Sequence, residues 1–331
     1  MVWKRFDNIP EIPLIDREDP KTYSITADVI SYRRCPRQYL LYRERGFVPP
    51  NATQFYFGTV VHQTLDVAHS HYRGYIEGVP KGSIPSSEDL YKYFRIAENG
   101  LFASGIRPFN HGKHGGLSAD NLIGTEDYDK LIDIIGPERA SAFYRIRFFN
   151  DVEGENLYPR VIDTECRIDA DQKDFIITGT VDVITTSDGG GRELWDYKSL
   201  KPEDLEETKR DGRDARMQMR IYAHIYNQRT GIMPTRGVIY SLGSIDPRTT
   251  PQGERPDDAI IEISDLDDED AYAKAIDEFN RTVREIEKAR QENDWPGPSS
   301  DPGKTTCDSC PRRWECPYVG DFKRFYPPRY P

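Results

Sequence analysis

Hydrophobic residues recur along the chain with two periods, and the longer period predicts helices. Spacings of three and four residues predict helices over 27–45, 57–75, 90–102, 128–149, 202–228 and 269–291. Pro36 must interrupt or kink the first helix, because proline lacks the N–H that a helix interior uses. We interpret the stretch at about 80–150 as a helical insertion.

Short runs rich in β-branched residues predict strands in the centre of the chain. These runs cover 160–168, 174–186, 192–199, 236–242 and 259–263. The glycines at 189–191 form a turn signal between the second and third runs and predict a hairpin there. Strands surrounded by helices indicate an α+β fold.

Proline, cysteine and charge divide the chain into four expected parts. An extended arm covers 1–26, a Cys-Pro helix segment 27–56, a core 57–295 and a Cys-rich tail 296–331. The tail holds too much proline and cysteine to form a hydrophobic core. We therefore expect a covalent or metal staple to hold it.

Composition restricts the setting in which the protein works. Five cysteines in 331 residues do not suit a secreted disulfide scaffold, and no apolar run is long enough to span a membrane. These features favour the cytoplasm. The net charge of −11 excludes a uniformly basic surface. A local basic channel is compatible with it, because arginine and lysine are dense at 33–45 and 209–220.

Acidic residues interrupt two of the predicted strands. Asp182 lies in an otherwise apolar strand, and Asp196 and Lys198 share one face of the next. If these strands pair as a hairpin, two carboxylates and an ammonium group converge into a site that suits Mg²⁺ or Mn²⁺. The lysine could then help to deprotonate a metal-bound water. The alternative is that all three are surface charges on half-exposed strands.

The cysteines at the end of the chain have the spacing of metal ligands. Cys307, Cys310 and Cys316 follow the pattern C-x₂-C-x₅-C. A tetrahedral site needs a fourth ligand, for which Cys35, Cys166 and a histidine are candidates. The spacing alone leaves open whether the site holds zinc or a [4Fe–4S] cluster.

Taken in order, these motifs resemble the PD-(D/E)XK nuclease superfamily. The closest similarity is to its RecB-like iron–sulfur branch, which includes CRISPR-associated iron–sulfur exonucleases and AddB-type nuclease modules. The motifs are Cys35-Pro36, Gly58-Thr-Val-Val-His62, Gly179-Thr-Val-Asp182, Asp196-Tyr-Lys198, Gln218-Met-Arg-Ile-Tyr222 and the three C-terminal cysteines. The resemblance implies a mixed central sheet flanked by helices.

The resemblance also implies roles for individual residues. His62, Asp182 and Asp196 would bind the catalytic metal, with the Tyr197 backbone carbonyl as a further ligand. Lys198 would be the catalytic lysine, acting with the two aspartates. Position 196 carries aspartate where many relatives carry glutamate, but aspartate also occurs in RecB-like members.

Two further groups of residues receive roles from the same resemblance. Gln218 and Tyr222, one helical turn apart, would position DNA or the lysine. Independently of the resemblance, Glu165, seventeen residues before Asp182, is a candidate for a supporting carboxylate next to the metal ligands. The [4Fe–4S] ligands would be Cys35, Cys307, Cys310 and Cys316.

The function implied is that of a Mg²⁺- or Mn²⁺-dependent deoxyribonuclease. We expect an exonuclease or flap nuclease that acts on single-stranded DNA ends in repair or recombination, CRISPR adaptation or phage defence. A helicase or a CRISPR or defence protein could deliver the DNA. Two alternatives are a catalytically inactive DNA-binding or assembly subunit of a helicase–nuclease complex and a zinc-stapled protein.

Overall fold

The structure is a computed structural model, and it places the chain in two compact units. It describes residues 14, 21–46, 52–108, 128–187, 189–299, 306–307, 310 and 316. One unit combines Met1–Pro50, Asp171–Ile177 and Asp277–Pro331, and the other combines Asn51–Ala170 and Thr178–Ile276. Most of the expected arm over 1–26 and of the tail over 296–331 lies outside the described residues.

A mixed sheet forms the centre of the unit that contains the hairpin. Its strands are β2 (Val161–Asp171), β3 (Phe175–Thr186), β4 (Arg192–Lys198), β5 (Arg236–Ser241) and β6 (Ile260–Ile263). β2 pairs with β3, and the order continues through β4 and β5 to β6. The β3–β4 and β5–β6 pairs are antiparallel, whereas β4 and β5 are parallel. The expected hairpin and the expected mixed sheet are both confirmed.

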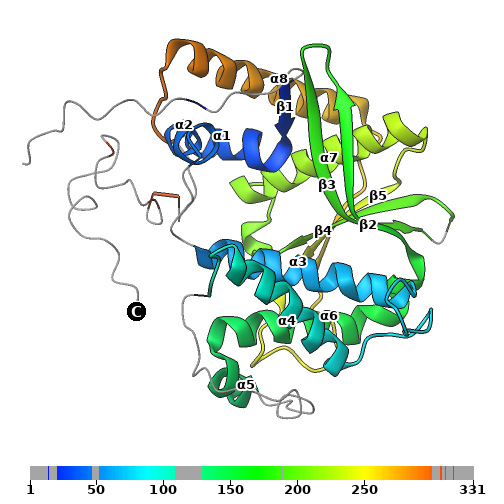
Figure 1. Ribbon diagram of the computed structural model, residues 1–331. Helices are drawn as coiled ribbons and strands as arrows, with labels where there is room; N and C mark the ends of the chain where they lie inside the picture. Colours follow the sequence, from blue (N-terminus) through cyan, green and yellow to red (C-terminus); the bar gives the residue numbers. More distant parts are fainter. Residues whose placement is uncertain are drawn as a thin grey trace, which may run out of the picture. The chain divides into compact units, whose positions relative to one another are not determined.

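Helices cover the two faces of this sheet. The helices of the unit are α3 (Ala52–Tyr72), α4 (Ser87–Ala103), α5 (Tyr128–Ile135), α6 (Pro137–Leu157) and α7 (Arg210–Thr230). Helices α3, α4 and α6 lie together on one side, and α7 lies on the other (Figure 1). α7 connects the parallel strands β4 and β5, which need such a crossover because a tight turn cannot join them.

Two of the predicted helices differ from the observed ones. The prediction over 128–149 is divided at Gly136, which has a φ of 85°, and Pro137 then begins α6. The prediction over 202–228 begins too early, because a short 3₁₀ turn (Pro202–Asp204) precedes α7. No side chain caps the N-terminus of α7, so its start carries no sequence signal.

Alternation along β4 separates the hydrophobic core from the polar site. Trp195 and Tyr197 pack into the cluster formed with the α3, α4 and α6 helices, together with Val238 and Tyr240 of β5. Asp196, between them, points to the opposite face, where it meets α7. The pleat therefore presents the acidic side chain on the α7 side while its neighbours anchor the strand.

A buried carboxylate joins the three helices on the core side. Glu98 of α4 is fully buried and accepts a 2.6 Å hydrogen bond from the Tyr56 hydroxyl of α3. The guanidinium of Arg139 in α6 binds both oxygens of Glu98, and Arg95 contacts one of them. A buried charge is stable only with such partners, so this network fixes the relative positions of α3, α4 and α6.

The other unit contains the broken N-terminal helix. Its described elements are β1 (Lys21–Ser24), η1 (Ile25–Ile30), α1 (Ser31–Arg34), α2 (Pro36–Tyr39), η2 (Leu40–Glu44) and the later part of α8 (Glu269–Glu292). The helix breaks at Cys35, which has an extended backbone, and Pro36 begins the next turn. The predicted interruption at Pro36 is confirmed.

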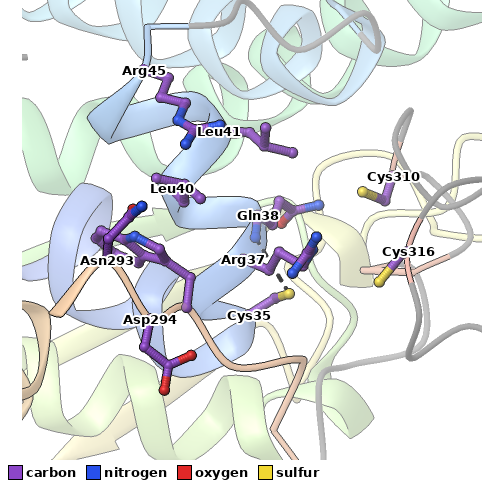
Figure 2. A pocket seen from close by; sticks show the side chains of 11 residues that line it. Cys35, Arg37, Gln38, Leu40, Leu41, Arg45, Asn293, Asp294, Cys310 and Cys316 are labelled. Atoms are coloured by element: carbon purple, nitrogen blue, oxygen red, sulfur yellow. Dashed lines mark hydrogen bonds between the residues drawn. The ribbon is translucent and has the colours of Figure 1, made fainter. Parts of the chain in front are cut away.

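Segments far apart in the sequence meet beside Cys35. The Ser299 N–H donates to the Arg34 carbonyl at 3.3 Å, and the Gln38 side-chain amide donates to the Thr306 carbonyl at 3.4 Å. A cavity of about 320 Å³ lies here, and its lining includes Cys35, Cys310 and Cys316 (Figure 2).

Close approach of α7 to β3 depends on a glycine. A Cβ atom at Gly179 would lie 2.3 Å from the ring of Tyr222, which is 2% exposed. We predict that Gly179→Ala lowers the free energy of unfolding by about 1–3 kcal/mol, because the ring has no free space to enter. Urea denaturation measures the change.

Gly189→Ala is the matched control for this substitution. Gly189 lies exposed in the β3–β4 turn, and no atom lies within 4 Å of a Cβ built there. Equal stability of the two variants would contradict the packing argument.

Candidate functional site

The backbone of Tyr197 organises the site at the end of the β3–β4 hairpin. The strand pairing runs from Thr186–Arg192 to Val183–Trp195. Beyond that pair the Tyr197 N–H donates to the Asp182 carboxylate Oδ2 at 2.7 Å. The Tyr197 carbonyl contacts the His62 Nε2 at 3.1 Å. Side chains from β3 and α3 therefore bind both polar groups of one β4 residue.

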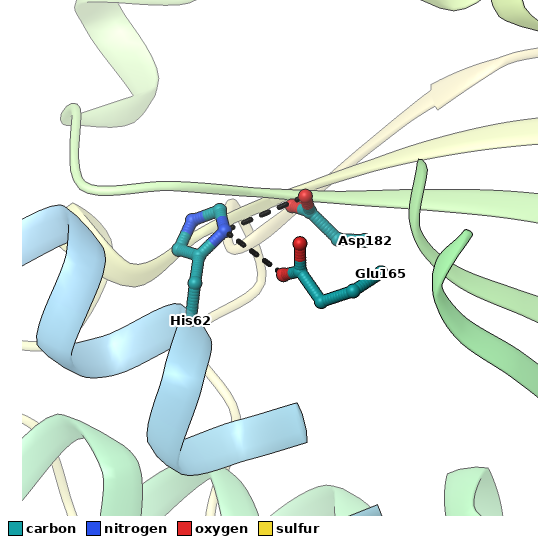
Figure 3. Close-up of side chains that lie close together, drawn as sticks. All are labelled: His62, Glu165 and Asp182. Carbon is teal, nitrogen blue, oxygen red and sulfur yellow. Dashed lines mark ion pairs between the residues drawn. The ribbon is translucent and has the colours of Figure 1, made fainter. Parts of the chain in front are cut away.

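These contacts fix how His62 presents its ring. If Nε2 carries the proton and donates it to the Tyr197 carbonyl, Nδ1 faces the carboxylates. Nδ1 lies 3.4 Å from Asp182 Oδ1 and 3.9 Å from Glu165 Oε1 (Figure 3). A histidine that donates one ring N–H to a backbone carbonyl and directs its other nitrogen to carboxylates has the typical arrangement of a metal ligand.

Glu165 reaches this group through an unusual backbone conformation. It lies within β2 and has a φ of 45°, which residues other than glycine rarely adopt. The preceding Thr164 hydroxyl donates to Asp66 of α3 at 2.5 Å. Strained backbone of this kind often occurs at functional sites, where the surrounding structure stabilises it.

The ionisable groups show that the site is short of positive charge. Burial opposes protonation of His62, but Asp182 raises the pKa of the imidazole to about 9. Partial burial and the charge of Asp182 raise the pKa of Glu165 to about 7. Both groups therefore tend to hold protons that a divalent cation at the same place would displace.

The two aspartates respond differently to their surroundings. Burial alone would raise the pKa of Asp182, yet His62 and the Tyr197 N–H hold that pKa below its usual value. Burial raises the pKa of Asp196 above its usual value even though Lys198 opposes the shift. Environments that shift the pKa values of two nearby carboxylates in opposite directions are typical of functional sites.

Lys198 and α7 complete the site on the other side of Asp196. The Lys198 Nζ lies 2.6 Å from Asp196 Oδ2 and donates to Gln218 Oε1 at 3.1 Å. The Gln218 amide donates in turn to Asp196 Oδ1 at 3.1 Å and to the Tyr222 hydroxyl at 2.9 Å. Gln218 and Tyr222 therefore hold the lysine and the aspartate in one orientation.

The ring of Tyr197 is anchored in the core behind the site. Its hydroxyl contacts Nε2 of the buried His69 at 3.1 Å, and its ring packs edge-on against Phe149 and Tyr240. Burial lowers the pKa of His69 to about 3, so this histidine stays neutral at physiological pH. The residue that supports Asp182 and His62 is therefore itself immobilised.

The donor set suits a hard divalent cation. One ligand atom each from His62, Glu165 and Asp182 lies within 4.8 Å of the others. Carboxylate oxygens with one imidazole are ligands that Mn²⁺ and Mg²⁺ accept. When bound, such an ion lowers the pKa of a coordinated water and stabilises negative charge on a phosphate.

The structure brings together the residues predicted around the hairpin. His62 and Asp182 lie in the candidate metal group, whereas Asp196 forms an ion pair with Lys198. The Tyr197 carbonyl, expected as a further ligand, contacts His62. Glu165 was predicted only as a supporting carboxylate. Its membership of the metal group depends on a left-handed backbone conformation, which has no sequence signal.

The cysteines lie where the sequence pattern grouped them. Cys35, Cys310 and Cys316 line the cavity of the first unit (Figure 2). Burial raises the pKa of Cys35 to about 11, and Cys310 and Cys307 both contribute to the shift. Cys166, the other candidate for a fourth ligand, lies in β2. The Cys35 sulfur accepts the Gln38 N–H at 3.4 Å and so caps the N-terminus of α2.

The mixed sheet thus brings two aspartates and a lysine together beside a histidine. The sequence model of the PD-(D/E)XK nuclease superfamily matches residues 27–317, and the chain belongs to that superfamily. Among curated proteins, none matches this sequence. Within the described part of the chain, no helix is long and apolar enough to cross a membrane.

Glu165 offers a test of the candidate metal centre. We predict that Glu165→Gly weakens Mn²⁺ binding by about tenfold or more, because a charged oxygen donor is lost. The substitution should not lower the melting temperature measured in EDTA, because glycine adopts a φ of 45° without strain. Calorimetric titration with Mn²⁺ measures the affinity.

Lys173→Gly is the control for backbone effects. Lys173 also has a positive φ, of 70°, and lies exposed in the turn between β2 and β3. The Lys173→Gly variant should bind Mn²⁺ with the same affinity as the unsubstituted protein. An unchanged affinity in Glu165→Gly would remove this residue from the metal centre.

Proposed function

We propose that the protein is a Mg²⁺- or Mn²⁺-dependent deoxyribonuclease that cleaves phosphodiester bonds near single-stranded DNA ends. The observation that carries this proposal is the orientation of His62 Nδ1 toward Asp182 and Glu165, beside the Asp196–Lys198 pair. Superfamily membership supports nuclease chemistry on DNA. The preference for ends, as in an exonuclease or flap nuclease, follows from the resemblance to RecB-like nucleases.

In this proposal each side chain has a defined task in hydrolysis. His62, Asp182 and Glu165 would hold the ion, and Asp196 would join them while it keeps its ion pair with Lys198. A water attacks the phosphorus, a new P–O bond forms, and the bond to the leaving sugar oxygen breaks. The water would lose one proton to the surrounding solvent, and the departing sugar oxygen would take one proton from solvent.

Lys198 is suited to stabilise this step. Its side chain is 23% exposed, so Nζ reaches solvent and substrate while Asp196 and Gln218 hold it. The ammonium group would orient the attacking water and lie against the negative charge that grows on the phosphate. Gln218 and Tyr222 would keep Nζ in place and so position it for the reaction.

The arginines near α7 are mostly engaged inside the protein. Arg216 donates to the carbonyls of Leu205 and Gly212, and Arg220 pairs with Asp265 at 2.6 Å. These contacts reduce the charge available for DNA. We therefore expect a weak intrinsic affinity for DNA, and we propose that a helicase or a CRISPR or defence protein delivers DNA ends for repair, recombination, adaptation or defence.

A nuclease assay tests the proposed function. Single-stranded DNA labelled at the 5′ or the 3′ end is incubated with Mn²⁺ or Mg²⁺, and the two labels together report activity and direction. We predict that Lys198→Ala lowers kcat by at least about a hundredfold, because the group that stabilises the reaction is removed.

Lys201→Ala is the matched control. Lys201 lies close by in the sequence, is 68% exposed and contacts Glu203 at the surface, so its loss should leave cleavage unchanged. Equal rates for Lys198→Ala and the unsubstituted protein would contradict the mechanism. DNA binding without cleavage under either ion would favour an inactive assembly subunit instead.

We further propose that Cys35, Cys307, Cys310 and Cys316 ligate a [4Fe–4S] cluster. Three of these cysteines line one cavity, and the charges of Cys307 and Cys310 act on Cys35. Arg37 and Arg45 line the same cavity and would balance the negative charge of a thiolate-bound cluster. Such a group would act as a structural staple in this unit.

Metal analysis of anaerobically purified protein tests the cluster. We predict iron with acid-labile sulfide and a broad absorption in the visible range, and we predict their loss in Cys35→Ser and Cys316→Ser. Cys166→Ser should retain both, because Cys166 lies in β2 and does not line the cavity. Colourless protein with stoichiometric zinc would contradict the cluster and indicate a zinc site instead.

A further inference from the structure

A groove between α3 and α4 opens directly from the candidate metal centre. It has a volume of about 770 Å³ and is lined by α3, α4 and Glu165 of β2. His62 and Glu165 belong both to the groove and to the metal group. Anything bound in the groove would therefore lie next to a phosphate held at the metal centre.

The groove exists because the two helices carry small residues where they face it. Gly58 of α3 and Gly100 of α4 both line it, and no atom lies within 4 Å of a Cβ built on either glycine. Larger residues at these positions would fill the space. The opening therefore results from the absence of side chains at these two positions of the sequence.

One wall of the groove is apolar and exposed. Ile96 of α4 is 58% exposed, one of few large hydrophobic side chains among the described residues with so much contact with water. Ala97 and Val67 extend this apolar lining. An exposed apolar wall beside a polar centre indicates a surface that a ligand covers.

The polar groups of the groove select against phosphate. Asp66 and Glu165 are acidic, and no lysine or arginine is among the described residues that line the groove. Thr59 and Gln63 offer hydroxyl and amide groups on the same helix face. The lining therefore suits an uncharged group with flat apolar faces and a polar edge.

We propose that this groove binds a nucleobase of the DNA strand next to the scissile phosphate. The proposal rests on the nuclease function above. A base would cover Ile96 and Ala97 with its apolar face, and its edge would meet Gln63 and Thr59. Its phosphate would lie at the metal centre, where Glu165 would bind the ion and so would not face the phosphate as a free charge. The occupant is thus one nucleotide unit of a single strand, because bases in a duplex are stacked and paired.

Two substitutions change the groove without touching the metal group. Gly100→Leu fills it, and because Gly100 lies in helix α4 with open space above it, leucine should not destabilise the fold. Ile96→Ala removes the apolar wall from an exposed position. Asn99→Leu is the matched control, since Asn99 is exposed on the same helix but does not line the groove.

Equilibrium binding tests the proposal separately from cleavage. The probes are a fluorescein-labelled single-stranded oligothymidylate and an oligonucleotide of the same length whose residues lack bases, both measured by anisotropy with Ca²⁺ in place of Mn²⁺. The unsubstituted protein and Asn99→Leu should bind the abasic probe roughly tenfold more weakly than oligothymidylate, because one stacked base typically contributes about a tenfold factor or more to the binding affinity. Gly100→Leu and Ile96→Ala should lose this preference.

The outcomes separate this proposal from the proposed function. An unsubstituted protein that binds both probes equally, or a Gly100→Leu variant that keeps the preference, would overturn the nucleobase site. Unchanged Mn²⁺ affinity in Gly100→Leu would show that the metal centre is intact. An unsubstituted protein that prefers oligothymidylate, loses this preference on Gly100→Leu and never cleaves DNA would retain the groove and reject the nuclease.

Discussion

The site depends on one residue of β4, Tyr197, whose backbone N–H and carbonyl bind side chains instead of the β3 backbone. Where the β3–β4 pairing ends, the Tyr197 N–H binds Asp182 and the Tyr197 carbonyl binds His62. Polar backbone groups in a buried strand need partners. This requirement draws an acid and an imidazole together and directs the free nitrogen of His62 to a place where negative charge collects.

The rest of the fold supports that arrangement from two sides. On the core side, aromatic rings and His69 immobilise Tyr197, and Glu98 fixes the helices from which His62 projects. On the other side, Gln218 and Tyr222 of α7 hold Asp196 and Lys198. Packing and hydrogen bonds thus hold charged groups in fixed positions, although some of these groups repel one another.

Sequence patterns predicted the frame of the site better than its details. Asp182, Asp196 and Lys198 could be placed together because strand alternation and a glycine turn determine which residues share a face. Glu165 was predicted only as a supporting carboxylate and not as a member of the metal group, because its φ of 45° departs from regular strand geometry and has no sequence signal. The start of α7 was misplaced because no side chain caps it, and the break at Gly136 was missed although Gly136-Pro137 is a local signal for a new helix start.

The unit that contains Cys35 is built from three separate stretches of chain, Met1–Pro50, Asp171–Ile177 and Asp277–Pro331. During synthesis, its first stretch leaves the ribosome long before Cys310 and Cys316, so it cannot reach its final packing until translation has passed them. The hairpin unit lacks this delay, because its residues are complete at Ile276. The unit that contains the hairpin can therefore fold before all the residues of the unit that contains Cys35 have been synthesised.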